Sequence, residues 1–152
     1  SNKLNEAINW TLEHTPLIKI ENSYVADFHS WNAKSIYFYD NNQNILEFIC
    51  RYDLNNSTDK TFAVETILSI SEIGIVTDQL LLFGEGIIEN AKVDYFSKSP
   101  KTEEFVAIGD DRGLFIISNP NRNWYPTQQL AEKWKVKGKI KAKDTVYDFE
   151  YN

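Results

Sequence analysis

The side chains capable of covalent or metal chemistry are few and far apart in this sequence. The chain has one cysteine, Cys50, and two histidines, His14 and His29. A cysteine, a histidine and an acid can form a nucleophilic triad. However, Cys50 shares one face of its expected strand with Leu46 and Phe48, which predicts a buried and inert thiol. The spacing of these residues matches no zinc motif, so we expect no catalytic residue, no metal site and no cofactor.

Carboxylates in adjacent pairs are followed by neighbouring aromatic residues in the second half of the chain. Adjacent residues on a strand point to opposite faces, so these pairs are poorly arranged for general acid or base catalysis. Surface charge selects a partner of opposite sign, and aromatic residues are typical anchors of interfaces. The predicted partner-binding residues are Glu103, Glu104, Asp110, Asp111, Trp124 and Tyr125.

A run of alternating lysines extends from Lys133 to Lys143. In a strand, successive side chains point to opposite faces, so the lysines would line one face and the apolar residues the other. The pattern predicts a strand with one face on the core and one in water.

Two functions are open for this lysine face. Lysines on an exposed edge discourage pairing with another sheet, and we favour this interpretation because the rest of the chain is acidic. The alternative is a module that binds RNA or another polyanion along the lysine row, with a tryptophan as a stacking platform. The residues of this alternative site are Lys133, Lys135, Lys137, Lys139, Lys141, Lys143 and Trp134.

The local patterns predict one helix and several strands. Apolar residues recur at helical spacing over 4–14. Residues 34–40 and 45–52 flank a cluster of turn residues and predict a hairpin. In its second strand, Glu47, Ile49 and Arg51 are expected on one face and Cys50 on the other. Residues 103–108 and 113–118 predict a second hairpin, placed at the centre of a sheet because both faces are apolar.

Other segments are less regular. Residues 17–28 predict a strand interrupted at 21–23, and Gly84–Glu85–Gly86 predicts a tight turn between strands at 80–83 and 87–88, with 92–97 continuing the meander. Residues 62–76 fit either a helix or a strand. Thr127 is expected to cap a helical turn, and the apolar pattern shifts by one residue at 143–144, which predicts a bulge or bend.

Length and composition indicate a globular protein. The 152 residues are the size of one domain, so we expect a single domain over 1–152 with an α+β fold, mostly an antiparallel sheet, a short N-terminal helix and one or two further short helices. No apolar run approaches the roughly 20 residues that a membrane helix needs. One cysteine weakly favours a reducing compartment, and we expect a cytoplasmic location.

An acidic, aromatic-rich protein without catalytic residues predicts a binding role. In this general character the chain resembles bacterial immunity proteins, which neutralise a toxin by covering its active site. The resemblance implies a non-enzymatic inhibitor with a basic protein partner, such as a nuclease toxin domain, and its net charge of −6 would steer that encounter. The alternatives are the polyanion-binding module and an enzyme of unrecognised type.

Overall fold

In the computed structural model the chain divides into two compact units, Ser1–Ser69 and Ile70–Asn152. The structure describes residues 2–142 and 145–151. Helices and strands of both units, in mostly antiparallel sheets, confirm the predicted α+β class. Two compact units can belong to one folding domain, so the single domain over 1–152 stays a prediction.

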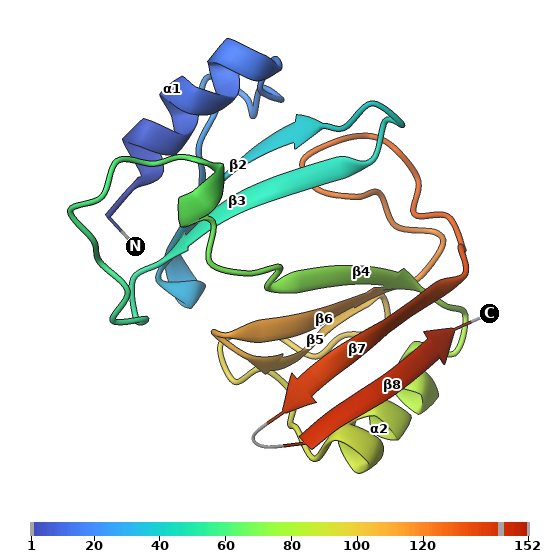
Figure 1. Cartoon of the computed structure of the whole chain (residues 1–152). Helices are drawn as coiled ribbons and strands as arrows, with labels where there is room; N and C mark the ends of the chain where they lie inside the picture. The colour runs from blue at the N-terminus through green and yellow to red at the C-terminus, as the bar shows by residue number, and fades with distance from the viewer. Residues whose placement is uncertain (1, 143–144, 152) are drawn as a thin grey trace. The chain divides into compact units, whose positions relative to one another are not determined.

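The first unit is a three-stranded sheet with a helix on one face (Figure 1). Its sheet has the order β1-β2-β3, and both pairs are antiparallel. The helix α1 packs through Ala7 against Ile36 and Phe38 of β2, so one sheet face forms the core of this unit. The elements are α1 (Leu4–His14), β1 (Ala26–Phe28), the 3-10 turn η1 (His29–Trp31), β2 (Ala33–Tyr39), β3 (Ile45–Arg51) and the 3-10 turn η2 (Val64–Thr66).

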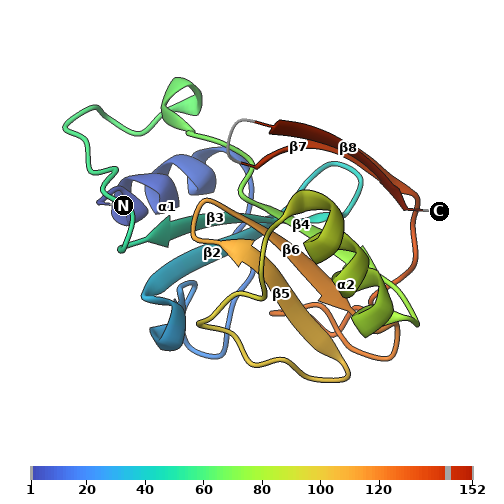
Figure 2. The same ribbon diagram turned by 90° about the horizontal axis from the view of Figure 1, so that it is seen from below.

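The second unit has a sheet with the order β4-β6-β5 and the helix α2 against it (Figure 2). β4 runs parallel to β6, whereas β5 and β6 form an antiparallel hairpin, and α2 lies in the connection from β4 to β5. The elements are β4 (Glu72–Val76), α2 (Leu80–Ala91), β5 (Phe105–Asp110), β6 (Gly113–Ser118), β7 (Val136–Ala142) and β8 (Thr145–Tyr151).

The core of the second unit lies between its sheet and α2. A separate antiparallel hairpin, β7 with β8, also packs against this core. The fully or largely buried core residues are Ile75, Leu80, Val106, Ile108, Phe115 and Ile117, and the hairpin contributes Val136, Ile140, Phe149 and Tyr151. Within the described residues, neither helix combines the length and apolar character that crossing a bilayer requires.

The helix over 4–14 and both predicted hairpins are confirmed. The interruption at 21–23 is also confirmed, because Ile20 and Ser23 bridge across a tight turn in which Glu21 has a φ of 51°. The strand predicted before the interruption is wrong, since only Ala26–Phe28 is a strand and Leu17 and Ile20 form isolated bridges. Residues 62–76 contain both a helical turn, η2, and a strand, β4.

The predicted turn at Gly84–Glu85–Gly86 is wrong, because these residues lie inside α2. Leu80, Phe83 and Ile87 recur at helical spacing and pack against the core. Gly84 is there for close packing, since a Cβ at this position would lie 2.9 Å from Cδ1 of Ile108.

Four other expectations are corrected. Residues 92–97 form no strand in the structure and touch the sheet through a single bridge at Tyr95. Of the hairpin predicted at the centre of the sheet, β6 is the central strand but β5 is an edge strand. Thr127 caps no helix, because its N–H and hydroxyl both donate to the Trp124 carbonyl in a turn. The lysine strand begins at Val136, after the first lysines, and the bulge at 143–144 lies outside the described residues.

Two glycines of α2 provide a matched test of this packing. Gly86→Ala adds a methyl group where no atom lies within 4 Å, so we expect it to stabilise the protein by about 0.5–1 kcal/mol through helix propensity. Gly84→Ala gains the same propensity but must displace Ile108, and such overpacking costs about 1–3 kcal/mol. Urea denaturation should therefore show Gly84→Ala less stable than the wild type. Equal stability of the two variants would refute the close contact.

Candidate functional site

The predicted acidic residues form two separate pairs in the second unit. Glu103 and Glu104 are exposed just before β5, whereas Asp110 ends β5 and Asp111 lies in the following turn. At about 3.3 Å per residue, the strand places Glu104 and Asp110 about 20 Å apart. The four carboxylates therefore do not form one patch.

The pair at the β5–β6 turn already has partners. Asp111 forms an ion pair with Lys98 at 2.5 Å, and both side chains are largely buried. Asp110 accepts a hydrogen bond from the backbone N–H of Arg112 at 2.7 Å and lies 3.6 Å from its guanidinium. These contacts stabilise the turn, so Glu103 and Glu104 are the more available carboxylates for a partner.

The two predicted aromatic anchors differ in exposure. The ring of Trp124 lies on β4, where Gly74 leaves room for it, since a Cβ on that glycine would be 2.9 Å from Cη2 of the indole. Tyr125 is 43% exposed. Tyr125 is the aromatic side chain that projects into solvent, and Trp124 is part of the packing of the second unit.

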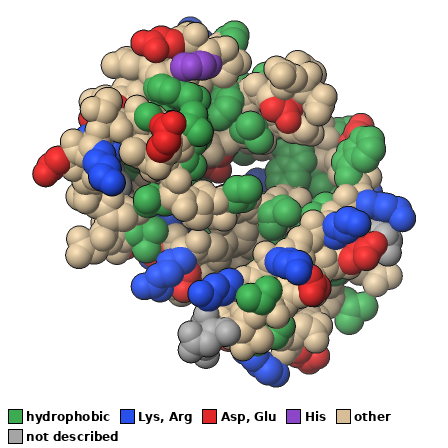
Figure 3. Space-filling model, viewed as in Figure 1, with side chains coloured by type: hydrophobic (Ala, Val, Ile, Leu, Met, Phe, Trp, Pro, Cys, Tyr) green, Lys and Arg blue, Asp and Glu red, His purple; other side chains and the backbone are tan. Residues whose placement is uncertain are grey.

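The lysine face of β7 lies beside carboxylates of β8. In the hairpin register Lys137 is opposite Glu150 and Lys139 is opposite Asp148, with Lys139 and Asp148 3.7 Å apart. Figure 3 shows basic and acidic side chains interspersed over this region. The face is therefore mixed in charge, which weakens attraction to a polyanion.

Lys141 of the polyanion alternative also lies in β7, opposite Val146, and the remaining residues of this set are outside the strand. Lys133 forms an ion pair with Asp78, and Lys135 precedes the strand. Trp134 is 71% exposed, and Lys143 lies outside the described residues. Polyanion binding stays a prediction.

Cys50 and His29 of the enzyme alternative both belong to the first unit. His29 lines a surface pocket of about 300 Å³ whose other residues are Asp27, Asn32, Ala33, Lys34 and Tyr52. Cys50 is paired with Lys34 in the sheet register but does not line this pocket. Burial raises the pKa of the Cys50 thiol, which disfavours the reactive thiolate.

Among the described residues, a group of largely buried polar side chains lies on the face of the first unit's sheet that is opposite α1. We call it the Glu47 face, and it comprises Ser35, Tyr37, Glu47 and Arg51. Because β-strand side chains alternate, the packing of Ile36 and its neighbours against α1 directs these four side chains to the other side.

Contacts across the hairpin hold the Glu47 carboxyl. Tyr37 is directly opposite Glu47 in the register, and its hydroxyl donates a hydrogen bond to Oε1 at 2.8 Å. Arg51 is only 3% exposed, and its guanidinium lies 5.5 Å from the centre of the Trp31 ring. The charge of Arg51 also acts on Glu47. A carboxyl, a phenol and a guanidinium are thus held on one face.

Burial raises the pKa of the Glu47 carboxyl, and this effect outweighs the lowering by its hydrogen-bonding neighbours and by Arg51. Ser35 is fully buried, and a hydrogen-bonding interaction of its side chain with Glu47 lowers the pKa of that carboxyl. Its hydroxyl nevertheless has no hydrogen-bond partner of ordinary geometry among the described residues. Perturbed carboxyls and unsatisfied buried hydroxyls are more frequent at functional sites than elsewhere.

Sequence reasoning placed Glu47 and Arg51 on the correct strand face but did not identify them as a site. The signal was present: a glutamate and an arginine stand on one face of a strand that is otherwise apolar. Such residues are mostly exposed unless they are paired, so no pattern in the sequence indicated that Glu47 and Arg51 would be buried.

Within residues 2–142 and 145–151, no three histidine, cysteine, aspartate or glutamate side chains are grouped to hold a metal ion. Comparison with protein families found none that matches the chain, and comparison with curated proteins found no significant relative.

The raised pKa of Glu47 predicts a specific pH dependence of stability. The folded protein holds this proton to a higher pH than the unfolded chain, whose glutamates titrate near about 4.3. As the pH rises from there through the folded pKa, the wild type loses stability that Glu47→Gln does not lose. Urea denaturation across this range should show the difference in unfolding free energy moving in favour of Glu47→Gln. A constant difference would contradict the burial of a titrating carboxyl.

Proposed function

We propose that the protein is a binding protein and that the Glu47 face is its site for a small polar ligand. The observation that carries the proposal is a carboxyl desolvated by burial and fixed by the Tyr37 hydroxyl, beside a buried serine hydroxyl that has no hydrogen bond of ordinary geometry within the described residues. Burying such groups costs free energy, and a ligand that completes their hydrogen bonds would recover it.

The chemistry of these groups defines the ligand class. The Glu47 carboxylate accepts hydrogen bonds, and the Ser35 hydroxyl can donate one. A matching ligand therefore carries a donor and an acceptor close together, as amides and amino-substituted heterocycles do. The expectation that the protein is not an enzyme stays a prediction, although a carboxyl with a raised pKa is also suited to proton transfer.

Ligand-observed NMR with a set of amide and amino-heterocycle fragments would test this site. We expect fragments that bind the wild type to bind Glu47→Gln about 10-fold more weakly or worse, because the amide cannot replace both carboxyl oxygens as hydrogen-bond partners. Glu13→Gln removes an exposed carboxylate of α1 and should leave binding unchanged. Equal binding to all three proteins would contradict the proposal.

Recognition of a basic protein partner, as by an immunity protein that covers a toxin, is the second candidate. The exposure of Glu103, Glu104 and Tyr125 favours it, whereas Asp110, Asp111 and Trp124 are engaged in contacts within the second unit. These exposed carboxylates and the tyrosine make up a smaller interface than the sequence predicted.

A pull-down from bacterial lysate at low and high salt would test the second candidate. We expect a basic protein to be captured at low salt, and its recovery to fall with Glu103→Gln/Glu104→Gln, because surface charge sets the rate of encounter. The matched control is Glu13→Gln/Glu65→Gln, which removes the same charge from exposed positions of the first unit. The same recovery with both double variants would exclude a role for the predicted carboxylates.

A further inference from the structure

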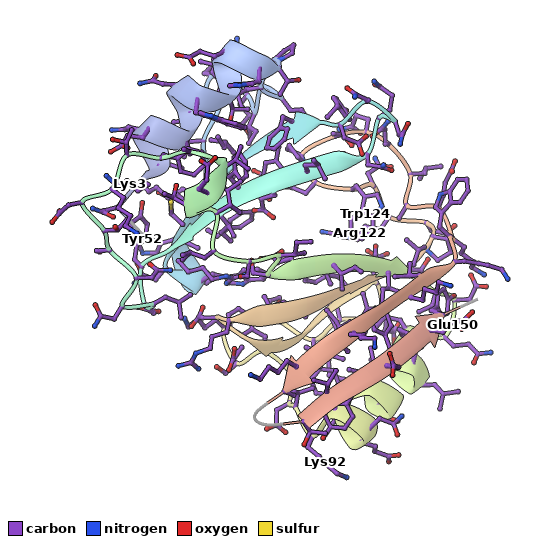
Figure 4. All side chains as sticks on the ribbon, in the orientation of Figure 1. Lys3, Tyr52, Lys92, Arg122, Trp124 and Glu150 are labelled. Atoms are coloured by element: carbon purple, nitrogen blue, oxygen red, sulfur yellow. The ribbon has the colours of Figure 1, made fainter. Side chains whose placement is uncertain are left out.

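Arg122 is a half-buried arginine in the loop that follows β6. Its guanidinium carbon lies 4.6 Å from the centre of the Phe105 ring, which it covers. Figure 4 labels Arg122 and Trp124, which come from the same loop. Trp124 packs on Gly74, whose strand neighbours face α2, so Trp124 lies on the sheet face opposite α2.

The loop holds Arg122 in a fixed place. The backbone carbonyl of Arg122 accepts a hydrogen bond from the N–H of Ala131 at 2.9 Å. The N–H of Trp124 donates to the backbone carbonyl of Gln129 at 2.8 Å. The two ends of the loop are thus paired as a short ladder. The arginine is held by backbone contacts and by its ring contact, so the backbone beneath its side chain is already ordered before any ligand binds.

The donors of the guanidinium are unused within the described part of the chain. Arginine carries five N–H donors, and Arg122 makes neither a side-chain hydrogen bond nor an ion pair among these residues. Burial lowers the pKa of Arg122, and the nearby charge of Glu104 opposes this effect without forming an ion pair. Arg112, in contrast, is exposed and is paired with Asp110.

We propose that Arg122 is the anchor of a binding site for a small organic carboxylate. A guanidinium matches a carboxylate with two parallel hydrogen bonds, which are stronger when the group is partly desolvated. The Phe105 ring supplies apolar surface beside it, which suits a carboxylate on an aromatic or other apolar body. This site is in the second unit and is independent of the Glu47 face.

Benzoate is the probe, with benzamide as its neutral isostere. Binding to the full chain would be followed through the indole N–H of Trp124 in two-dimensional NMR, assigned with Trp124→Phe. We expect benzoate to shift this signal and benzamide to leave it in place. Arg122→Met should weaken benzoate binding about 10- to 100-fold, and Arg122→Lys, which keeps the charge but loses the two-pronged geometry, should also weaken it.

Two further variants separate a binding role from a structural one. Arg112→Met removes an exposed arginine of the same unit and should leave benzoate binding unchanged. Glu104→Gln removes the carboxylate that repels the probe and should strengthen binding, an effect that damage to the fold would not produce. The proposal is overturned if the wild type does not bind benzoate, if benzamide binds equally well, or if Arg122→Lys and Glu104→Gln both bind as the wild type does.

Discussion

The alternation of side chains along the β2–β3 hairpin is the constraint on which the first unit depends. Packing against α1 requires Ile36, Phe38 and Phe48 to lie on one face. The register then leaves Tyr37 and Glu47 opposite each other on the other face. A slip of one residue would exchange the two faces and bury the charged side chains in the α1 core. The apolar core thus determines where the polar site lies.

Burial of the polar groups on the Glu47 face costs free energy of folding, and the apolar packing of the opposite face against α1 offsets this cost. An ionised carboxyl out of water is costly unless it is paired and hydrogen-bonded. Glu47 receives a hydrogen bond from Tyr37 and the field of Arg51, yet its pKa remains raised, so the desolvation is only partly compensated. Residual strain of this kind is what a ligand can relieve, which connects the packing of α1 to the proposed function.

Sequence patterns predicted those helices and strands whose signal lies within a few neighbouring residues. The turn residues Asn41–Asn44 located the first hairpin, and lysine alternation located β7 from Val136 onward. The turn prediction at Gly84 was wrong because glycine occurs both in tight turns and where a helix packs closely against its neighbour. Only the contact with Ile108, which is distant in sequence, shows that Gly84 has the second role. The burial of Glu47 and the contact of Arg122 with Phe105 depend on residues distant in sequence, so no local pattern predicts them.

The most direct test of the account is the titration of the Glu47 side-chain carboxyl by carbon-13 NMR, with Glu47→Gln used to assign its signal. We expect a midpoint clearly above about 4.3, the ordinary value of a glutamate side chain. A midpoint at or below that value would show a solvated or fully compensated carboxylate, and the Glu47 face would lose its basis as a site.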